Sequence, residues 1–323
     1  MAKAFVFPGQ GSQAIGMGKG LAEAFAAARN VFEEVDEALN QKLSALMFEG
    51  PEAELTLTAN AQPALMATSL AALRVLEAEA GLDLAREAAF VAGHSLGEYS
   101  ALAAAGSLSI ADAARLLRRR GEAMQQAVPV GKGAMAALIG LDYEAGLAVA
   151  AEAQRETGAD SVCAIANDNG GGQVVVSGSK AAVERAIEIA RTKGARRAIA
   201  LPVSAPFHCA LMQPAAEVMA AALAKVELKA PKVPLVANVL AAPIQDPNEI
   251  RKRLVEQVTG TVRWRESVAF MAGQGVSEFI ELGWGKVLTG LLKRIVDNAL
   301  GISVGTPAEV KAYKAVAERT RRS

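Results

Sequence analysis

The stretch FVAGHSLGEYS, residues 90–100, places a serine between an apolar run and a helical segment. The apolar run ends at Gly93, and the pattern G-x-S-x-G continues through Ser95 to Gly97. This pattern after a strand is typical of a nucleophile elbow, a sharp turn that exposes a serine hydroxyl. The sequence therefore predicts strand, turn and helix here, with Ser95 as a candidate nucleophile.

Further strand-like runs lie on both sides of this elbow, separated by long helical patterns. With the elbow strand, they occupy residues 4–7, 88–92, 233–239 and 276–282. Strands that alternate with helices form mostly parallel sheets that are covered on both faces. We therefore expect an α/β fold, whose longest helix has Pro63 in its first turn and ends before Gly81.

The middle of the chain has a different order, strand-helix-strand-strand-helix-strand, over residues 134–203. This order is that of a ferredoxin-like unit, and the linker-like stretches VPVGKG and LPVSAP flank it. We predict a small subdomain at 128–202, inserted in a catalytic domain made of 1–127 and 203–323. Its turn NDNGGGQ is by default a flexible turn, and Asn167 is a secondary candidate for a substrate contact.

Composition excludes several classes of protein. The 323 residues carry 34 basic and 34 acidic side chains, which argues against attraction to nucleic acid or to an anionic membrane. The start of the chain has one lysine and an apolar run that stops at Pro8, unlike a signal peptide. With two histidines, and Cys163 and Cys209 as expected reduced thiols, a cytoplasmic protein without a structural metal is predicted.

A serine hydroxyl needs a base that accepts its proton. The chain has only two histidines, and His94 adjoins Ser95, where neighbouring side chains of a tight turn point in different directions. His208 in SAPFHCALM is therefore the candidate base. Asp168 is the only acid in a turn between Ser95 and His208, and it makes no convincing third member, so a backbone carbonyl is an alternative orienting group.

The stretch SIADAARLLRRRGEAM, residues 109–124, predicts an amphipathic helix with an apolar stripe that includes Met124. Arg120 falls on this stripe, whereas Arg118 and Arg119 are expected in solvent. A buried guanidinium needs acceptors, because an unpaired buried charge is very costly. Two interpretations stay open: an internal Arg–Glu pair, or a bidentate clamp for a substrate carboxylate such as that of malonate.

A glycine loop follows the first predicted strand. Gly9, Gly11 and Ala14 match the dinucleotide pattern G-x-G-x-x-A, but the helices that follow do not lead to the required second strand. The backbone N–H groups of Gln10 and Leu96 could instead form an oxyanion hole. A plain tight turn explains the two glycines equally well.

Taken together, these stretches resemble the family of malonyl-CoA:acyl-carrier-protein transacylases. The resemblance covers residues 4 to about 292 and rests on these motifs in order: FVFPGQGSQ, NAQPAL, GHSLGEYSAL, RRGEAM, GGQVVVSG, PFHCALM and GKVLTGLL. It implies an α/β-hydrolase-like core with a mostly parallel sheet and an inserted ferredoxin-like subdomain. It also implies Ser95 as acyl nucleophile, His208 as base, Arg120 as carboxylate clamp, and Gln10 and Leu96 as oxyanion donors.

The same resemblance implies further site residues. RLVEQVTGTVRW resembles the segment whose glutamine, here Gln257, orients the histidine through its carbonyl. Phe207 resembles the bulky residue associated with malonyl preference, and Met124 and Asn167 complete the expected substrate contacts. The chain departs from the family pattern at 170–172, where three glycines replace a serine-proline pair, and at Trp284.

The implied reaction is a ping-pong transfer of malonyl from malonyl-CoA to the phosphopantetheine thiol of acyl carrier protein, without metal or redox cofactor. We expect a monomer. The cluster Lys193, Arg196 and Arg197 could dock the acidic carrier, although a solvated surface is the commoner role of such a cluster. The alternatives are a serine esterase or thioesterase of related fold, and a scaffold that binds carrier protein without catalysis.

Overall fold

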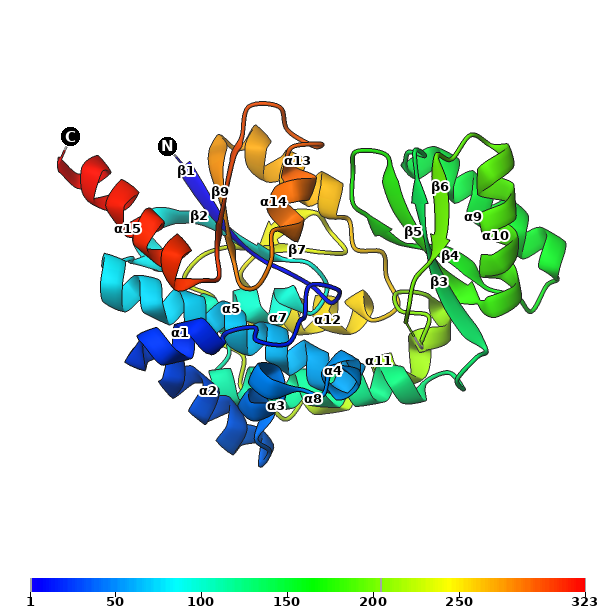
Figure 1. The fold of residues 1–323 in the computed structure, drawn as a ribbon. Helices are drawn as coiled ribbons and strands as arrows, with labels where there is room; N and C mark the ends of the chain where they lie inside the picture. Colours follow the sequence, from blue (N-terminus) through cyan, green and yellow to red (C-terminus); the bar gives the residue numbers. More distant parts are fainter. Residues whose placement is uncertain (1, 204, 323) are drawn as a thin grey trace.

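Two separate β-sheets organise the chain in the computed structural model, which describes residues 2–203 and 205–322 (Figure 1). The larger sheet has the strand order β10-β9-β1-β2-β7-β8 and is parallel except for β8. Its strands are β1 (Ala2–Phe7), β2 (Ala88–Gly93), β7 (Leu235–Ala237), β8 (Ala242–Ile244), β9 (Val276–Leu282) and β10 (Leu300–Val304). The predicted α/β fold with a mostly parallel sheet is confirmed.

Helices cover both faces of this sheet. Along β1, Phe5 and Phe7 belong to the core on the face of α5, α7 and α8, whereas Ala4 and Val6 pack with α13 and α14 on the other face (Figure 1). The helices of this part are α1 (Lys19–Ala24), α2 (Ala26–Leu39), α3 (Leu43–Glu49), α4 (Glu52–Thr56), α5 (Thr58–Ala80), α6 (Leu84–Glu87), α7 (Gly97–Ala104), α8 (Ile110–Gln126), η1 (Ala210–Met212), α11 (Gln213–Leu223), α12 (Pro247–Gln257), α13 (Trp264–Gly273), α14 (Val287–Leu292) and α15 (Pro307–Arg322). A strand buried on both faces is mostly apolar, which is why the inner strands β1, β2, β7 and β9 were visible in the sequence.

The long helix α5 begins earlier than predicted. It starts at Thr58, so Pro63 lies inside the helix and not in its first turn, while Gly81 ends it in the left-handed conformation as expected. Gly121 of α8 packs against this first turn so closely that a Cβ there would lie 2.6 Å from the Thr58 carbonyl oxygen. Packing of α8 on α5 therefore favours helix in a segment that the proline alone would exclude.

The second sheet forms a lobe of its own (Figure 1). Its order β4-β5-β3-β6 is antiparallel, and its elements are β3 (Gly133–Ile139), α9 (Tyr143–Thr157), β4 (Cys163–Asp168), β5 (Gln173–Ser179), α10 (Lys180–Thr192) and β6 (Arg197–Ala200). A separate apolar core fills the space between this sheet and its two helices. The predicted ferredoxin-like unit is confirmed, and all its elements lie within 128–202.

The last residues of β4 connect this lobe to the larger one through backbone hydrogen bonds. Val262 donates from its N–H to the Ala166 carbonyl at 2.8 Å and accepts from the Asp168 N–H at 3.0 Å. The Asp168 carboxylate also accepts from Arg265 Nε at 2.8 Å. Asp168 is therefore committed to the junction between the lobes.

Candidate active site

The elbow between β2 and α7 has the geometry that its glycines predict. Ser95 has φ 55°, in the left-handed region. A Cβ on Gly93 would lie 1.9 Å from the Gly97 carbonyl carbon, and a Cβ on Gly97 would lie 2.2 Å from the Phe7 carbonyl oxygen. Only glycine permits this approach of three backbone segments, which presents the serine at the end of the sheet.

Asn238 holds the elbow from the neighbouring strand. Its Oδ1 accepts from the Ser95 N–H at 2.8 Å, and its Nδ2 donates to the Gly93 carbonyl at 2.6 Å. Asn238 follows β7, which pairs with β2 in parallel. Sequence reasoning missed this residue, although a polar side chain at the carboxyl end of a strand beside the elbow strand was an available signal.

His208 lies against the serine hydroxyl. Its Nε2 is 2.7 Å from Ser95 Oγ, while its Nδ1 donates to the backbone carbonyls of Gln257 at 2.8 Å and Gly260 at 3.2 Å. With Nδ1 protonated by these partners, Nε2 is left to accept the Ser95 proton. Carbonyl oxygens and not Asp168 thus orient the imidazole.

Burial, and then the positive charge of Arg120, lower the pKa of His208 to about 3. The imidazole is therefore neutral at neutral pH, which is the form that can act as a base.

Arg120 reaches the same hydroxyl from α8. Its Nη2 donates to Ser95 Oγ at 3.1 Å and to Gln257 Oε1 at 2.8 Å, and its Nη1 donates to Gln62 Oε1 at 2.9 Å. The side chain is 1% exposed. Among the described residues it forms no ion pair with a carboxylate, and its Nε has no partner. The internal Arg–Glu pair is thus not formed, and a buried cation beside the nucleophile is left for an anion.

The other two arginines of this helix differ from each other. Arg119 is exposed, as predicted. Arg118 is half-buried and donates to Asn60 Oδ1 and to Gln41 Oε1, so its prediction as a solvated side chain was wrong. The helix stripe that faces α2 and α5 is wider than the apolar pattern suggested, because uncharged amide oxygens also accept a guanidinium.

A cavity of about 320 Å³ opens onto these groups. Its lining includes most of the predicted site residues: Gln10, Ser95, Leu96, Arg120, Met124, Asn167, Phe207 and His208. Gln257 is fully buried and is not one of the lining residues. Its side chain contacts two of them, Arg120 and Ser95. Gln62 also lines the cavity and was missed, although it lies within the recognised motif NAQPAL.

The two predicted oxyanion donors are accessible to a ligand. Within the described residues, neither the Leu96 N–H nor the Gln10 N–H donates to another group of the protein, and both residues line the cavity. The Gln10 side chain is held by Thr58 Oγ1 at 3.3 Å. Free N–H groups beside a nucleophile are the arrangement that stabilises a developing oxyanion.

The glycine turn of the small lobe contacts the elbow and has a left-handed backbone. Asn169 Oδ1 lies 2.9 Å from His94 Nε2, which ties the turn to the elbow, and Asn167 pairs with Val262. Residues 170–172 all have φ between 59° and 74°, a conformation that glycine adopts without strain. His94 thus contacts the glycine turn and not Ser95 Oγ.

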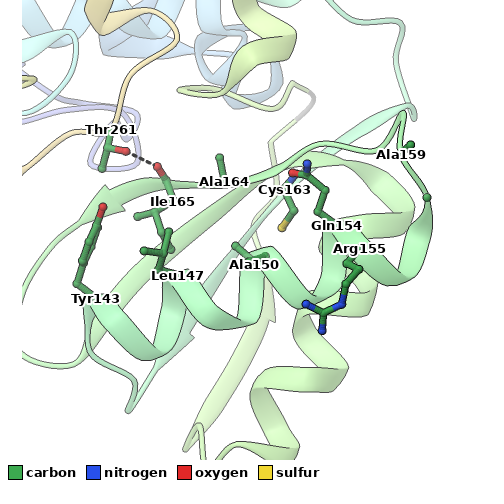
Figure 2. A pocket seen from close by; sticks show the side chains of 12 residues that line it. Tyr143, Leu147, Ala150, Gln154, Arg155, Ala159, Cys163, Ala164, Ile165 and Thr261 are labelled. Atoms are coloured by element: carbon green, nitrogen blue, oxygen red, sulfur yellow. Dashed lines mark hydrogen bonds between the residues drawn. The ribbon is translucent and has the colours of Figure 1, made fainter.

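A larger hollow of about 620 Å³ lies elsewhere, on the small lobe (Figure 2). It lies between α9 and the edge strand β4, where Thr261 Oγ1 donates to the Ile165 carbonyl. Cys163 is its only cysteine, and burial raises the pKa of this thiol to about 12. This hollow therefore supplies no thiolate at neutral pH.

Among the described residues, no helix combines the length and the apolar character that a bilayer crossing requires. No group of three or more His, Cys, Asp or Glu side chains among them could hold a metal ion.

Comparisons with known proteins show what the chain is similar to over nearly its whole length. The model of the acyl transferase domain family matches residues 4–314. A Bacillus subtilis (strain 168) protein named malonyl CoA-acyl carrier protein transacylase is 48% identical over 308 residues, 95% of each chain. The crystal structure of an acyl-carrier-protein S-malonyltransferase from Bartonella henselae is 58% identical, with TM-score 0.95 over 98% of this chain and 100% of that one. A malonyl-transacylase in complex with a type II PKS acyl-carrier protein is 43% identical, with TM-score 0.93 over 98% and 100%.

Proposed function

The chain belongs to the acyl transferase domain family, and from this premise we propose that it moves a malonyl group from malonyl-CoA to the phosphopantetheine thiol of an acyl carrier protein. One observation carries the choice of acyl group. A buried guanidinium without a carboxylate partner lies 3.1 Å from the hydroxyl of Ser95. An acyl chain that ends in a carboxylate supplies the missing anion, and malonyl is such a chain.

The first half-reaction forms an ester on Ser95. His208 Nε2 takes the hydroxyl proton as Oγ bonds to the malonyl carbonyl carbon, and the Gln10 and Leu96 N–H groups hold the oxyanion. The carbon–sulfur bond then breaks, and the imidazolium returns its proton to the sulfur of the leaving coenzyme A. Arg120 holds the free carboxylate throughout.

The second half-reaction reverses these roles. The carrier thiol gives its proton to His208 and bonds to the acyl carbon, after which the bond to Oγ breaks and Ser95 regains the proton. Met124 and Phe207 contribute apolar side chains to the lining of the cavity. Apolar side chains beside the ester support transfer to a thiol over hydrolysis, because they disfavour water there.

This reaction needs no metal or redox cofactor, since the nucleophile, the base and the cation all come from side chains of one protomer. We further propose a monomer in the cytoplasm, a location consistent with the free buried thiols of Cys163 and Cys209. An esterase or thioesterase has no use for a buried cation in its acyl site. A scaffold has no use for the Ser95–His208 contact.

The carrier protein is proposed to approach the small lobe. Arg196 and Arg197 are exposed before and at the start of β6, whereas Lys193 is paired with Glu152 at 2.7 Å. The two arginines are thus the part of the predicted basic cluster that is free of that ion pair. An acidic partner gains association rate from such charges.

Intact-protein mass spectrometry after brief exposure to malonyl-CoA tests this function. We expect one malonyl adduct, which disappears when holo carrier protein is added and malonyl-carrier forms. Ser95→Ala should form no adduct. Ser100→Ala, which removes a buried hydroxyl of the neighbouring helix α7, is the matched control and should keep the adduct. Release of free malonate without malonyl-carrier would contradict the proposal.

A further inference from the structure

A buried carboxylate lies behind the proposed clamp and has no part in the two half-reactions. Glu98 is the second residue of α7 and is 1% exposed. It forms no ion pair with a basic side chain among the described residues; its hydrogen bonds go to uncharged groups. A charge kept in such a place is costly, so its contacts need an explanation.

These contacts lead to Gln257. Glu98 Oε2 accepts from Gln257 Nε2 at 2.5 Å, and Glu98 Oε1 accepts from the Asn238 N–H at 3.4 Å. Gln257 Nε2 also donates to the Ser95 carbonyl at 2.9 Å. The nitrogen of the Gln257 amide therefore faces three acceptors, the third being Asn238 Oδ1 at 3.4 Å, and its oxygen faces Arg120 Nη2 at 2.8 Å.

The orientation of this amide matters because its two ends have opposite hydrogen-bonding roles. Turned end for end, Gln257 would place its oxygen against the Glu98 carboxylate and its N–H₂ against the guanidinium. Acceptor would then face acceptor, and donor would face donor. Glu98, together with the Ser95 carbonyl, thus favours the orientation in which Gln257 accepts from Arg120.

We propose that Glu98 is a positioning residue for the malonyl carboxylate: it fixes the Gln257 amide, which in turn fixes the guanidinium of Arg120. This inference rests on the proposed function, because it assigns a task only if Arg120 binds the acyl carboxylate. It predicts that Glu98 affects the choice of acyl group more than the reactivity of Ser95.

The cost of keeping an acid here supports a role beyond packing. Burial raises the pKa of Glu98 to about 7, against the opposing effects of the hydrogen bonds from Gln257 and Asn238 and of the Arg120 charge. A neutral glutamine would fill the same space without that cost. The two donors face different oxygens of Glu98, however, and in a glutamine one of these oxygens is replaced by an N–H₂ group, which cannot accept from its donor.

Glu98→Gln is the test, with malonyl-CoA and acetyl-CoA as the two donors and kcat/KM as the measurement. We expect the malonyl value to fall about tenfold or more, mainly through KM, and the acetyl value to change less than about threefold. A neutral fluorophosphonate that labels serine should react with Ser95 at the wild-type rate. Equal losses with both donors, or slower labelling, would make Glu98 a structural residue and overturn the inference.

Glu281→Gln is the matched control. Glu281 is also fully buried and accepts from two backbone N–H groups, those of Leu288 and Thr289, but it has no contact with the site. We expect its malonyl-to-acetyl ratio, which is kcat/KM for malonyl-CoA divided by kcat/KM for acetyl-CoA, to equal that of the wild type. A ratio that falls as far as in Glu98→Gln would show that any lost buried carboxylate has this effect, which contradicts the inference.

Coupling to the clamp is tested in an Arg120→Ala background. If Glu98 acts through Arg120, adding Glu98→Gln should leave the malonyl-to-acetyl ratio of that variant unchanged within about twofold. A further drop would contradict the inference. Should Glu98→Gln not fold, Gln257→Met keeps the carbonyl that orients His208 and removes only the amide. Gln257→Met must lower the same ratio. An unchanged ratio would show that the Gln257 amide does not position Arg120 and would overturn the inference.

Failure of this inference and failure of the proposed function give different results. If wild-type protein forms no malonyl-carrier, the proposed function is wrong. If wild-type protein transfers malonyl and Glu98→Gln keeps its acyl selectivity, only the role of Glu98 is wrong.

Discussion

Replacing Arg120 by alanine separates binding of the acyl carboxylate from activation of the serine. The guanidinium is 1% exposed and donates to Ser95 Oγ, Gln62 and Gln257, so the variant loses a buried cation and three hydrogen bonds. Removing one partner of a buried charge pair costs about 2–5 kcal/mol, which corresponds to roughly 30- to 4,000-fold. We expect kcat/KM for malonyl-CoA to fall within this range.

Acetyl-CoA should respond differently, because it has no carboxylate to lose its partner. Arg120 also lowers the pKa of His208, after the larger effect of burial. The base works in its neutral form, so activity is present above this pKa and is lost as the pH falls through it. Without the guanidinium the pKa of His208 rises, and the acid limb of the acetyl profile should move to higher pH.

Steady-state kinetics with both donors, over a range of pH, make the measurement. Arg118→Ala is the matched control, since it lies on the same helix and loses hydrogen bonds to Asn60 and Gln41 without touching Ser95. Its malonyl-to-acetyl ratio should stay at the wild-type value. A malonyl loss below about threefold in Arg120→Ala, or an equal loss with both donors, would refute the clamp.

Three further changes test the elbow and the docking surface. Asn238→Ala leaves the Ser95 N–H and the Gly93 carbonyl without their partner, so the free energy of unfolding in urea should fall by about 2–4 kcal/mol. An unchanged free energy would show that Asn238 does not stabilise the elbow. Gly97→Ala brings a Cβ within 2.2 Å of backbone and should lower the Tm severely, whereas Gly290→Ala meets nothing within 4 Å and should raise or keep it. Arg197→Glu should raise KM for carrier protein several-fold and leave KM for malonyl-CoA unchanged; equal effects on both would exclude docking there.

The chemistry of the site was predictable where it depends on local pattern. The elbow is a five-residue motif, and its strand is apolar because both faces are covered. Arg120 was noticed because helical periodicity places it among apolar residues. His208 followed from a count, since the chain has only one other histidine. Each inference needed no knowledge of what the side chain touches.

Residues whose task comes from long-range contacts could not be found in this way. Asn238 and Gln62 are ordinary polar residues in the sequence, and only the pairing of β7 with β2 and of α5 with α8 brings them to Ser95 and Arg120. Short edge strands were missed for a related reason. β8 contains Pro243 and has only three residues, so it has no pattern of its own and exists because β7 is there to pair with.

No acid of the described residues contacts His208, and the carboxylate clamp proposed for Arg120 explains why. Gln257 contacts both groups, with its backbone oxygen on His208 Nδ1 and its side-chain oxygen on Arg120 Nη2. A carboxylate at this junction would orient the imidazole, but it would also form an ion pair with the guanidinium and compete with the substrate carboxylate. An uncharged oxygen orients the imidazole and leaves the cation unpaired. The same reasoning explains why Glu98 contacts the Gln257 amide and not the guanidinium. A direct ion pair between Glu98 and Arg120 would neutralise the positive charge that the substrate carboxylate needs.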